Sequence, residues 1–561
     1  MKKHILALVL VSITVLLAAQ PSPNCYRLYL ADKNNNSYSI DNPSAFLSER
    51  ALAKRARFNI AITEQDLPIT PQYKQQIRSV DANIRLLAES KWMNTVTIYC
   101  PDSTRLPQIL ALSFVDSILP VASYDETLMS AQLAPEAEIP YQEPIVINHD
   151  TIIPYDYGSG YAQIAVHNGH LLHNEGFRGE GMLIAVFDAG WYGLDQISEF
   201  SPLFTNGQML GTRDLIPFRN NVFVGHSHGT LVTSTMSMLQ EGTLVGTAPE
   251  ASYFFIRSEE PASEQLIEED FWAYAAEIAD SIGADVINSS LGYCGFPDFP
   301  QAEMTYEQVD GVWSIASRAA TILGQKGVVV CVSAGNEGDN EWYHIGHPAD
   351  AFDILAVAAV GIDSVVAGFS SRGPSYDGRI KPDVASVGVN TYCFYPEWAG
   401  PELPVYYFGW LGTASGTSLA GPVLAGMCAC LWQALPAASS QQIMQFVREN
   451  GSCANNPNNE IGYGIPDFYA AYNSHVANPT YRPLSIEVYP NPCTNQLFIN
   501  NSKQDIVSVQ LFATNGNLVK QLSKTNSWQV SIPMNDLPAG LYLGQVRLQN
   551  GETQYFKVVK Q

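Results

Sequence analysis

Three short segments of this chain hold side chains that could together carry out nucleophilic chemistry. Asp188 lies in Val-Phe-Asp-Ala-Gly, His228 in His-Ser-His-Gly-Thr and Ser418 in Gly-Thr-Ser-Leu-Ala-Gly-Pro. A serine hydroxyl is a poor nucleophile at neutral pH, so a neutral imidazole must take its proton during attack and return it to the leaving group. A buried carboxylate would fix the tautomer of that imidazole. We therefore predict that Ser418 attacks, His228 transfers the proton and Asp188 orients His228.

The neighbouring segments predict elements that would position these side chains. Residues 182–187 form an unbroken apolar run typical of a buried parallel strand, and Asp188 follows at the carboxyl end, where functional groups of open α/β sheets collect. Residues 419–432 are long and apolar enough for a buried helix. Because the first N–H groups of a helix lack partners, the backbone N–H of Ser418 is an expected oxyanion donor.

The chain order Asp, His, Ser, in these segments, resembles the subtilisin-like serine peptidases. Weaker matches follow in the same order as in that family: Gly-Thr-Ala-Pro-Glu-Ala at 246–251, Phe-Ser-Ser-Arg-Gly-Pro at 369–374 and Gly-Tyr-Gly-Ile-Pro-Asp at 462–467. The resemblance covers about residues 160–475. It implies an α/β fold with a mainly parallel sheet flanked by helices, and hydrolysis of peptide bonds through an acyl-enzyme intermediate.

Two histidines compete for the role of the base. The family pattern His-Gly-Thr selects His228, and His226 is then a loop residue. A metal site formed by the two rings is the alternative, but no cysteine or carboxylate stands beside them at a ligand-like spacing. We therefore assign no metal to this pair.

The resemblance also assigns residues to the oxyanion hole and to substrate binding. Asn336, in Ser-Ala-Gly-Asn, matches the side-chain amide that acts with the backbone N–H of the nucleophile. The family strand that pairs with an extended substrate matches Ser290, Leu291 and Gly292. By alignment, Ser333, Gly335 and Gly346 border the first substrate pocket. Their small size predicts room for a large apolar or aromatic side chain.

Some positions depart from the family pattern. Ala189 follows Asp188 where Ser or Thr is usual, and Leu419 replaces the Met that usually follows the serine. No departure removes a catalytic group. Two other functions remain open: a catalytically silent surface adhesin built on a subtilisin fold, and a transpeptidase that passes the acyl group to an amine.

The ends and the charge of the chain bear on its location. Residues 1–19, with Lys2 and Lys3 before an apolar run, predict a secretory signal that is too short to span a bilayer. We expect no membrane span once it is removed. With 54 acidic and 30 basic residues, the net charge of -24 argues against nucleic acid or anionic lipid as a partner.

The segment before the catalytic motifs predicts a small α+β unit at 20–130. Residues 25–31 and 92–100 indicate strands, and 42–58 a charged helix. This unit resembles the inhibitory propeptide of the family, with an ordinary additional domain as the alternative. Residues 131–157, rich in Pro, Glu and Ile, predict an exposed linker where the chain could be cut.

The catalytic domain is expected at 158–477 and an all-β sandwich at 478–561, where seven short strands alternate with turns such as Asn-Gly. Val-Tyr-Pro-Asn-Pro at 488–492 and Leu-Pro-Ala-Gly-Leu-Tyr at 537–542 resemble the C-terminal sorting domain of the Bacteroidetes type IX secretion system. This implies export through the outer membrane, with the secretion machinery as a partner. A carbohydrate-binding or adhesive sandwich is the alternative.

The cysteines give little sign of metal or redox chemistry. Nine is an odd number for a secreted chain, so at least one should lack an intramolecular partner, and Cys25 with Cys100 could clip the N-terminal unit. No Cys-x-x-Cys spacing occurs, and we expect no cofactor. Members of the family often bind calcium, but no ligand set for it is visible in the sequence.

Overall fold

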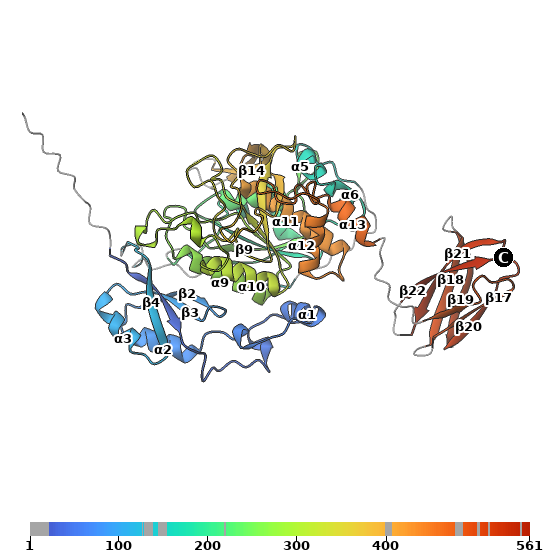
Figure 1. The fold of residues 1–561 in the computed structure, drawn as a ribbon, viewed down its shortest axis with the longest axis horizontal. Coiled ribbons are helices and arrows are strands. Elements are labelled where there is room, and N and C mark those ends of the chain that lie inside the picture. Colours follow the sequence, from blue (N-terminus) through green and yellow to red (C-terminus); the bar gives the residue numbers. More distant parts are fainter. Residues whose placement is uncertain are drawn as a thin grey trace, which may run out of the picture. The chain divides into compact units, whose positions relative to one another are not determined.

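The chain forms two compact units, Met1–Ser474 and His475–Gln561 (Figure 1). This computed structural model describes residues 22–125, 127, 129, 139–143, 154–217, 220–398, 407–476, 486–501, 505–513, 517–549 and 553–561. The predicted signal at 1–19 lies outside the described residues.

A seven-stranded sheet forms the centre of the first unit, in the order β13-β12-β11-β10-β5-β9-β6. Every neighbouring pair in it is parallel. The strands are β5 (Leu183–Asp188), β6 (Met209–Asp214), β9 (Ser252–Arg257), β10 (Val286–Ser289), β11 (Val329–Ser333), β12 (Leu355–Val360) and β13 (Val384–Val387). The structure thus confirms the predicted α/β fold with a parallel sheet.

Helices cover both faces of this sheet. Alternate side chains of β5 point to opposite faces, as the pleat of a strand requires. Leu183, Ala185 and Phe187 pack in the core with α9 (Glu268–Ile282) and α10 (Ile315–Gln325). The intervening Ile184 and Val186 pack in the core with α8 (His228–Ser237) and α11 (Thr417–Ala434). The sheet is therefore buried on both sides, and strands such as β5 and β12 are nearly continuous apolar runs.

Shorter elements complete the central domain. They are α5 (Tyr161–Ala165), α6 (Gly169–Asn174), α7 (Ser201–Thr205), α12 (Ser440–Glu449), α13 (Phe468–Val476), β7 (Leu239–Gln240), β8 (Leu244–Val245), β14 (Thr391–Trp398) and β15 (Tyr407–Ala414). Strands β14 and β15 form an antiparallel hairpin.

The N-terminal domain is a four-stranded antiparallel sheet in the order β2-β3-β1-β4 with short helices. Its elements are β1 (Cys25–Leu30), α1 (Glu49–Arg57), α2 (Pro71–Ser79), β2 (Arg85–Ser90), β3 (Thr95–Tyr99), α3 (Leu106–Leu110) and β4 (Val115–Ala122). The predicted helix at 42–58 begins only at Glu49, because Pro43 starts a separate turn and the Ser48 side chain caps α1 by accepting from Ala51 N–H. The predicted strand at 92–100 begins at Thr95, after a turn that ends at Asn94.

A disulfide between Cys25 and Cys100 is a wrong prediction, since all nine cysteines are free. Cys25 is directly opposite Tyr99 in the β1–β3 pair. The next residue, Cys100, therefore faces the other side of the sheet. Accordingly, Cys25 lies in the core shared with α9, and Cys100 lies in the separate core of the N-terminal domain.

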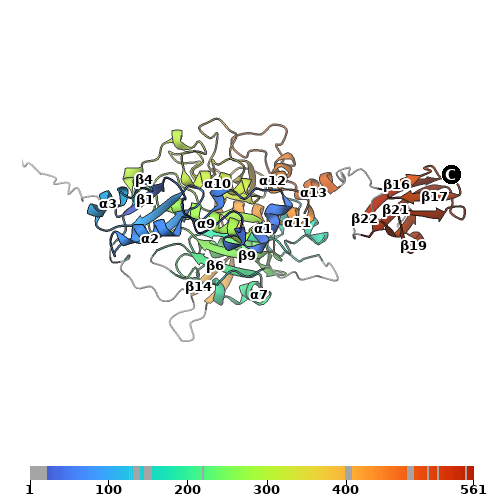
Figure 2. The same cartoon turned by 90° about the horizontal axis from the view of Figure 1, so that it is seen from below.

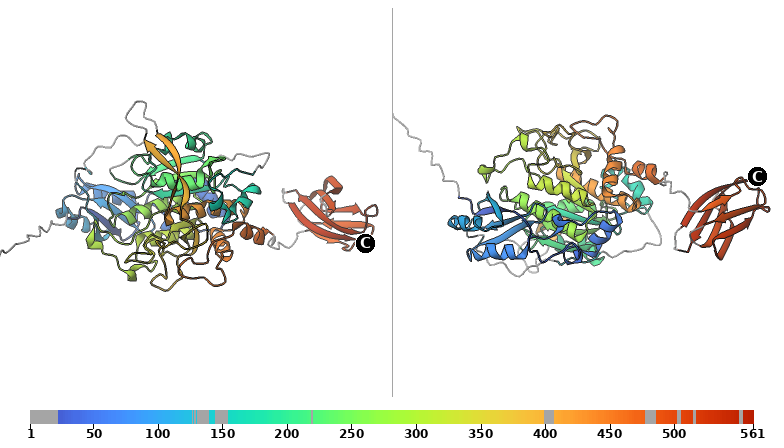
Figure 3. Two further views of the ribbon diagram at one scale, coloured as in Figure 1. Left: turned by 90° about the horizontal axis from the view of Figure 1, so that it is seen from above. Right: turned by 60° about the horizontal axis from the view of Figure 1, so that its bottom comes forward.

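The N-terminal domain lies against the central domain (Figure 3). Buried carboxylates of α9 join the two domains. Arg27 donates to both oxygens of Asp270 at 2.7 and 2.6 Å. Glu277 accepts from Ser90 Oγ at 2.6 Å, and from the backbone N–H groups of the two residues that follow Ser90 at 2.8 and 2.9 Å. The end of β2 and the acidic side of α9 are thus held together by hydrogen bonds to charged groups, which are stronger than hydrogen bonds between neutral groups.

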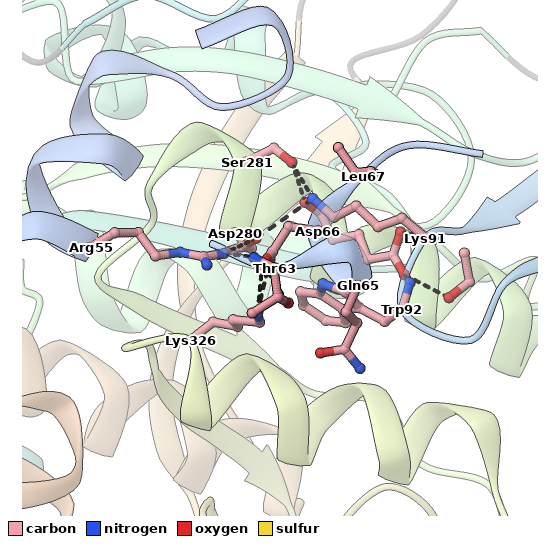
Figure 4. A network of polar contacts seen from close by, with 12 residues as sticks. Arg55, Thr63, Gln65, Asp66, Leu67, Lys91, Trp92, Asp280, Ser281 and Lys326 are labelled. Carbon is pink, nitrogen blue, oxygen red and sulfur yellow. Dashed lines mark hydrogen bonds and ion pairs between the residues drawn. The ribbon is translucent and has the colours of Figure 1, made fainter. Parts of the chain in front are cut away.

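Helix α1 lies apart from the sheet of its own domain and crosses the central domain below α10 (Figures 1 and 2). Figure 4 shows the charged network that holds this segment. Arg55 donates to Asp66 at 3.0 Å and to Asp280 of α9 at 2.8 Å. Lys326, just after α10, donates to Asp66 at 2.9 Å. Lys91 Nζ also lies 3.6 Å from Asp280 Oδ2. Two carboxylates and three cations from both domains therefore share one buried network.

Part of the predicted linker at 131–157 pairs with the central sheet. Thr212 N–H donates to Ile139 O at 2.8 Å, and Gln142 N–H donates to Leu210 O at 2.7 Å. Residues 139–142 thus run along the edge strand β6. Residues 131–138 and 144–153 lie outside the described residues.

The second unit contains all seven predicted strands, in two antiparallel sheets. The first sheet is β16 (Glu487–Tyr489), β17 (Gln496–Asn500) and β20 (Gln529–Pro533), and the second is β18 (Ile506–Ala513), β19 (Leu518–Ser527), β21 (Gly540–Leu548) and β22 (Thr553–Lys560). Leu497 and Ile532 of the first sheet share one apolar core with Leu511 and Val546 of the second. This arrangement is a β-sandwich.

Candidate active site

The parallel sheet brings the ends of three strands to one edge. Asp188 is the last residue of β5, Ser290 follows β10, and Asn336 lies three residues beyond β11. Strands β5, β10 and β11 are neighbours in the sheet and run in the same direction. Their carboxyl ends, which in open α/β sheets are the usual place for a site, therefore lie together.

Asp188 and His228 form a close pair at this edge. His228 Nδ1 lies 2.9 Å from Asp188 Oδ1 and 3.0 Å from Oδ2. The Asp188 side chain is fully buried, whereas that of His228 is 28% exposed. Burial lowers the pKa of His228, but the Asp188 carboxylate, its hydrogen bond and Glu259 outweigh this and raise the pKa above its usual value. The pair holds the ring with its second nitrogen free to accept a proton.

Gly229 allows this contact. Its N–H donates to Gly190 O at 3.0 Å, so the start of α8 abuts the turn after β5. A Cβ at Gly229 would lie 2.6 Å from the same oxygen, which is closer than any side chain permits. A glycine after His228 is therefore required to bring the ring to Asp188.

His226 takes a different position from His228. Its Nδ1 accepts the backbone N–H of His228 at 3.2 Å, and its side chain is exposed. Among the described residues, no hydrogen bond or ion pair joins His226 to Asp188. Its ring therefore supports the start of α8.

Ser418 is the second residue of α11, at the rim of the same edge. Its Oγ donates to Ser290 O at 3.3 Å, and Ser290 Oγ donates to Ser418 O at 2.8 Å. The part of the chain that the structure describes has no hydrogen bond between Ser418 and His228. Attack would need the hydroxyl to turn about χ1 toward the imidazole, a change between staggered rotamers. Such contacts are often loose in the absence of substrate.

Asn336 is held through its amide oxygen. Oδ1 accepts from the Thr417 N–H at 2.9 Å and from the Thr417 hydroxyl at 3.1 Å. The Nδ2 group is therefore the one left to donate toward a ligand. Because Thr417 precedes Ser418, this contact also ties the amide to the first turn of α11.

A cavity of about 220 Å³ is lined by His228, Asn336 and Ser418. Of the predicted substrate-binding residues, Ser290, Leu291, Gly292, Ser333 and Gly335 line it as well. Gly346 is not among the lining residues. A Cβ at Gly346 would lie 2.6 Å from Cys294 Sγ, so this glycine makes room for a lining residue and does not border the cavity itself.

Other lining residues were missed by the sequence analysis, namely His226, Glu259, Pro261, Cys294 and Glu337. Glu259 and Pro261 follow β9, which is parallel to β5, so their place after an apolar strand was a usable signal. Cys294 belongs to no recognised motif, and burial raises its pKa, which leaves it a protonated thiol.

In the described ranges, no group of three or more His, Cys, Asp or Glu side chains is placed to hold a metal ion. None of the described helices is both long and apolar enough to cross a membrane.

Three family models match successive parts of the chain. Residues 25–136 match the peptidase S8 propeptide domain of Bacteroidota, and residues 217–464 match the subtilase family. Residues 487–561 match the secretion system C-terminal sorting domain, which indicates export to the cell surface or the extracellular space.

Individual relatives agree with these matches. Serine protease AprX of Bacillus subtilis is 27% identical over 320 residues, which cover 52% of this chain and 65% of that protein. Human membrane-bound transcription factor site-1 protease is 26% identical over 65% of this chain and 32% of its own length. Subtilisin E of Bacillus subtilis is 28% identical over 57% of this chain and 72% of its own. The chain thus spans less than two thirds of the first two relatives.

A solved structure shows the same fold. Fervidolysin from Fervidobacterium pennivorans, a keratinolytic enzyme related to subtilisin, has a TM-score of 0.51 at 18% identity, covering 97% of this chain and 77% of that one. Taken with the strand order, this likeness shows a subtilisin-like fold. The matched segments identify a subtilase domain at 217–464, with a peptidase S8 propeptide domain before it and a secretion sorting domain after it, and the subtilase domain and its subtilisin relatives support a serine-type peptidase.

Proposed function

We propose that this protein is an exported serine endopeptidase that hydrolyses peptide bonds of polypeptides through an acyl-enzyme intermediate. Ser418 is the nucleophile, His228 the general base and acid, and Asp188 the residue that orients His228. The strongest support is the pair in which both oxygens of a buried carboxylate lie within 3.0 Å of His228 Nδ1, beside a cavity that Ser418 and Asn336 also line.

The reaction follows from this geometry. With its Nδ1–H donated to Asp188, His228 keeps Nε2 as an acceptor for the Ser418 proton. Ser418 Oγ then attacks the carbonyl carbon, and the resulting oxyanion accepts hydrogen bonds from the backbone N–H of Ser418 and from Asn336 Nδ2. His228 returns the proton to the leaving amine, and water releases the acyl group by the same steps. One such oxyanion donor contributes about 10²–10³ to turnover.

Substrate binding rests on the main chain of the residues after β10. Ser290, Leu291 and Gly292 line the cavity directly beside Ser418. An extended peptide that pairs with them would obtain its main-chain hydrogen bonds whatever its sequence. Side-chain pockets then set the choice of cleavage site.

Peptide hydrolysis by the purified exported protein tests this proposal. We expect cleavage within an internally quenched peptide by the wild type and a loss of at least about 10³-fold in the Ser418→Ala variant. The matched control is Ser415→Ala, which removes a nearby hydroxyl that only accepts the Asn390 N–H and should leave the rate unchanged. Equal rates for Ser418→Ala and wild type would contradict the proposal, and folded wild type that cuts no peptide would favour the silent adhesin.

A further inference from the structure

Glu259 is a carboxylate in the cavity without a partner. It lines the cavity together with His226, His228 and Pro261. Within the described residues it forms no hydrogen bond and no ion pair. Two carboxylates, Glu259 and Glu337, line this cavity, and no Lys or Arg does.

The surroundings of Glu259 disfavour its charge. Burial, followed by the nearby acids Glu264 and Asp188, raises the pKa of Glu259 to about 8, and His228 alone acts in the opposite direction. Glu264 is itself affected, since burial and Asp298 raise its pKa to about 7. A group that brings a positive charge to this wall would relieve the repulsion among these acids and supply the missing partner.

The position of Glu259 indicates which part of a substrate could supply that charge. Side chains of an extended peptide alternate between opposite directions. If the residue whose carbonyl is attacked points toward Ser333 and Gly335, the preceding residue points away from them. Glu259 lies two residues after Arg257, which pairs with Asp188 at the end of β5, and it lines the cavity together with His228. It therefore belongs to the part of the cavity beside the catalytic base.

We propose that Glu259 selects substrates with a Lys or Arg immediately before the residue whose carbonyl is attacked. The inference rests on the proposed function and adds a substrate class to it: polypeptides with a cationic side chain at this position. The ammonium or guanidinium group forms an ion pair with Glu259 at the rim of the cavity. This preference adds to the expectation that the first pocket takes a large apolar or aromatic side chain.

The sequence indicates which segment of the chain such a preference would protect from cleavage. No Lys or Arg occurs between Arg105 and Arg178, a span that includes the segment between the N-terminal and central domains. This segment is instead rich in Glu. The preference would therefore keep the enzyme from cutting readily between its own domains.

Three peptides that differ only at this position, carrying Lys, norleucine or Glu, test the proposal. We expect the exported wild type to cut the Lys peptide with a kcat/KM about tenfold higher than the norleucine peptide, which is the size of discrimination that a single contact usually gives. The kcat/KM for the Glu peptide should be lower than that for the norleucine peptide. In Glu259→Gln, which keeps the shape but removes the charge, the Lys to norleucine ratio should fall to about one. In the matched variant Glu337→Gln, which alters the other cavity carboxylate, the ratio should persist.

The controls separate failure of this inference from failure of the proposed function. Each preparation is also treated with a fluorophosphonate that labels an active serine. Labelled wild type that cuts all three peptides equally overturns the role of Glu259. A Lys preference that survives in Glu259→Gln, or one that is lost only in Glu337→Gln, overturns it as well. Protein that is neither labelled nor able to cut any peptide overturns the proposed function, and this inference with it.

Discussion

His228 is subject to opposing effects on its charge. Burial disfavours the imidazolium, whereas Asp188 and Glu259 favour it, and the pKa of His228 is raised above its usual value of 6.5 as a result. The same contacts that fix the ring thus also raise the pH at which the neutral imidazole appears. Only that neutral form can accept the serine proton.

The pH dependence of hydrolysis follows from this balance. Below the pKa of His228 the base is protonated and inactive, so kcat/KM for a peptide without titratable groups should rise with pH, with a midpoint above 6.5. A midpoint below 6.5 in the wild type would show that burial outweighs the carboxylates.

At the scale of residues, motifs predicted the side chains that the structure gathers at one edge of the sheet but not all of those that shape the cavity. Asp188, His228 and Ser418 each stand in a short segment with a chemical reason for its residue types. Glu259 stands in no motif, and its relevance depends on where the loop after β9 lies. The role of Gly346 could not be derived either, because the contact it makes room for, with Cys294, arises only when distant segments fold together.

At the scale of elements, α9 is both a wall of the catalytic core and the surface that binds the N-terminal domain. Its apolar residues face the sheet, and Asp270, Glu277 and Asp280 face the N-terminal domain. Gly283, the residue that ends α9, approaches Ala51 so closely that a Cβ would lie 2.6 Å from its nitrogen. A single helix therefore couples the stability of the two domains.

Removal of one buried cation should loosen this contact. Arg27 and Asp270 are 5% and 2% exposed, so Arg27→Ala leaves a buried carboxylate without its cation and should cost about 3–5 kcal/mol in the free energy of unfolding of the full chain. Lys74→Ala is the matched control, because Lys74 and Glu89 are 27% and 25% exposed and such pairs contribute about 0–1 kcal/mol. Denaturant titration measures both. Equal losses would show that the Arg27 pair does not anchor the domain.

Element types were easier to predict from the sequence than their limits. The apolar run at 182–187 predicted a strand because both faces of a parallel sheet are buried. The start of α1 was misplaced, because Pro43 begins a separate turn and the Ser48 side chain caps the helix, which therefore starts only at Glu49. The predicted Cys25–Cys100 disulfide is wrong because the number of cysteines does not show which face of the sheet each cysteine occupies.

At the scale of the whole molecule, the catalytic and sorting functions lie in separate compact units. Among the described residues, the buried cores of the first unit end at Ala471, with Tyr472 packed against them, and the sandwich has its own core of residues from Ile486 to Val558. Each unit can therefore bury its apolar residues without the other.

Truncation after residue 477 should separate export from catalysis. We expect the shortened chain to unfold at the same temperature as the first unit of the full chain and to hydrolyse peptides at the same rate, because no core residue is lost. It should remain inside the cell envelope, since the sorting domain is missing. Fractionation and peptide assays check both points; truncated protein in the medium at the wild-type level would contradict the role of the sandwich.

The central claim is that folding gathers Asp188, His228 and Ser418 into one nucleophilic site. Peptide mass spectrometry of the full chain after reaction with a fluorophosphonate tests it most directly. The account predicts one modified residue, Ser418, with the rate of modification reduced by several orders of magnitude in His228→Ala. Modification of another residue, or equal modification of Ser418 without the imidazole, would contradict it.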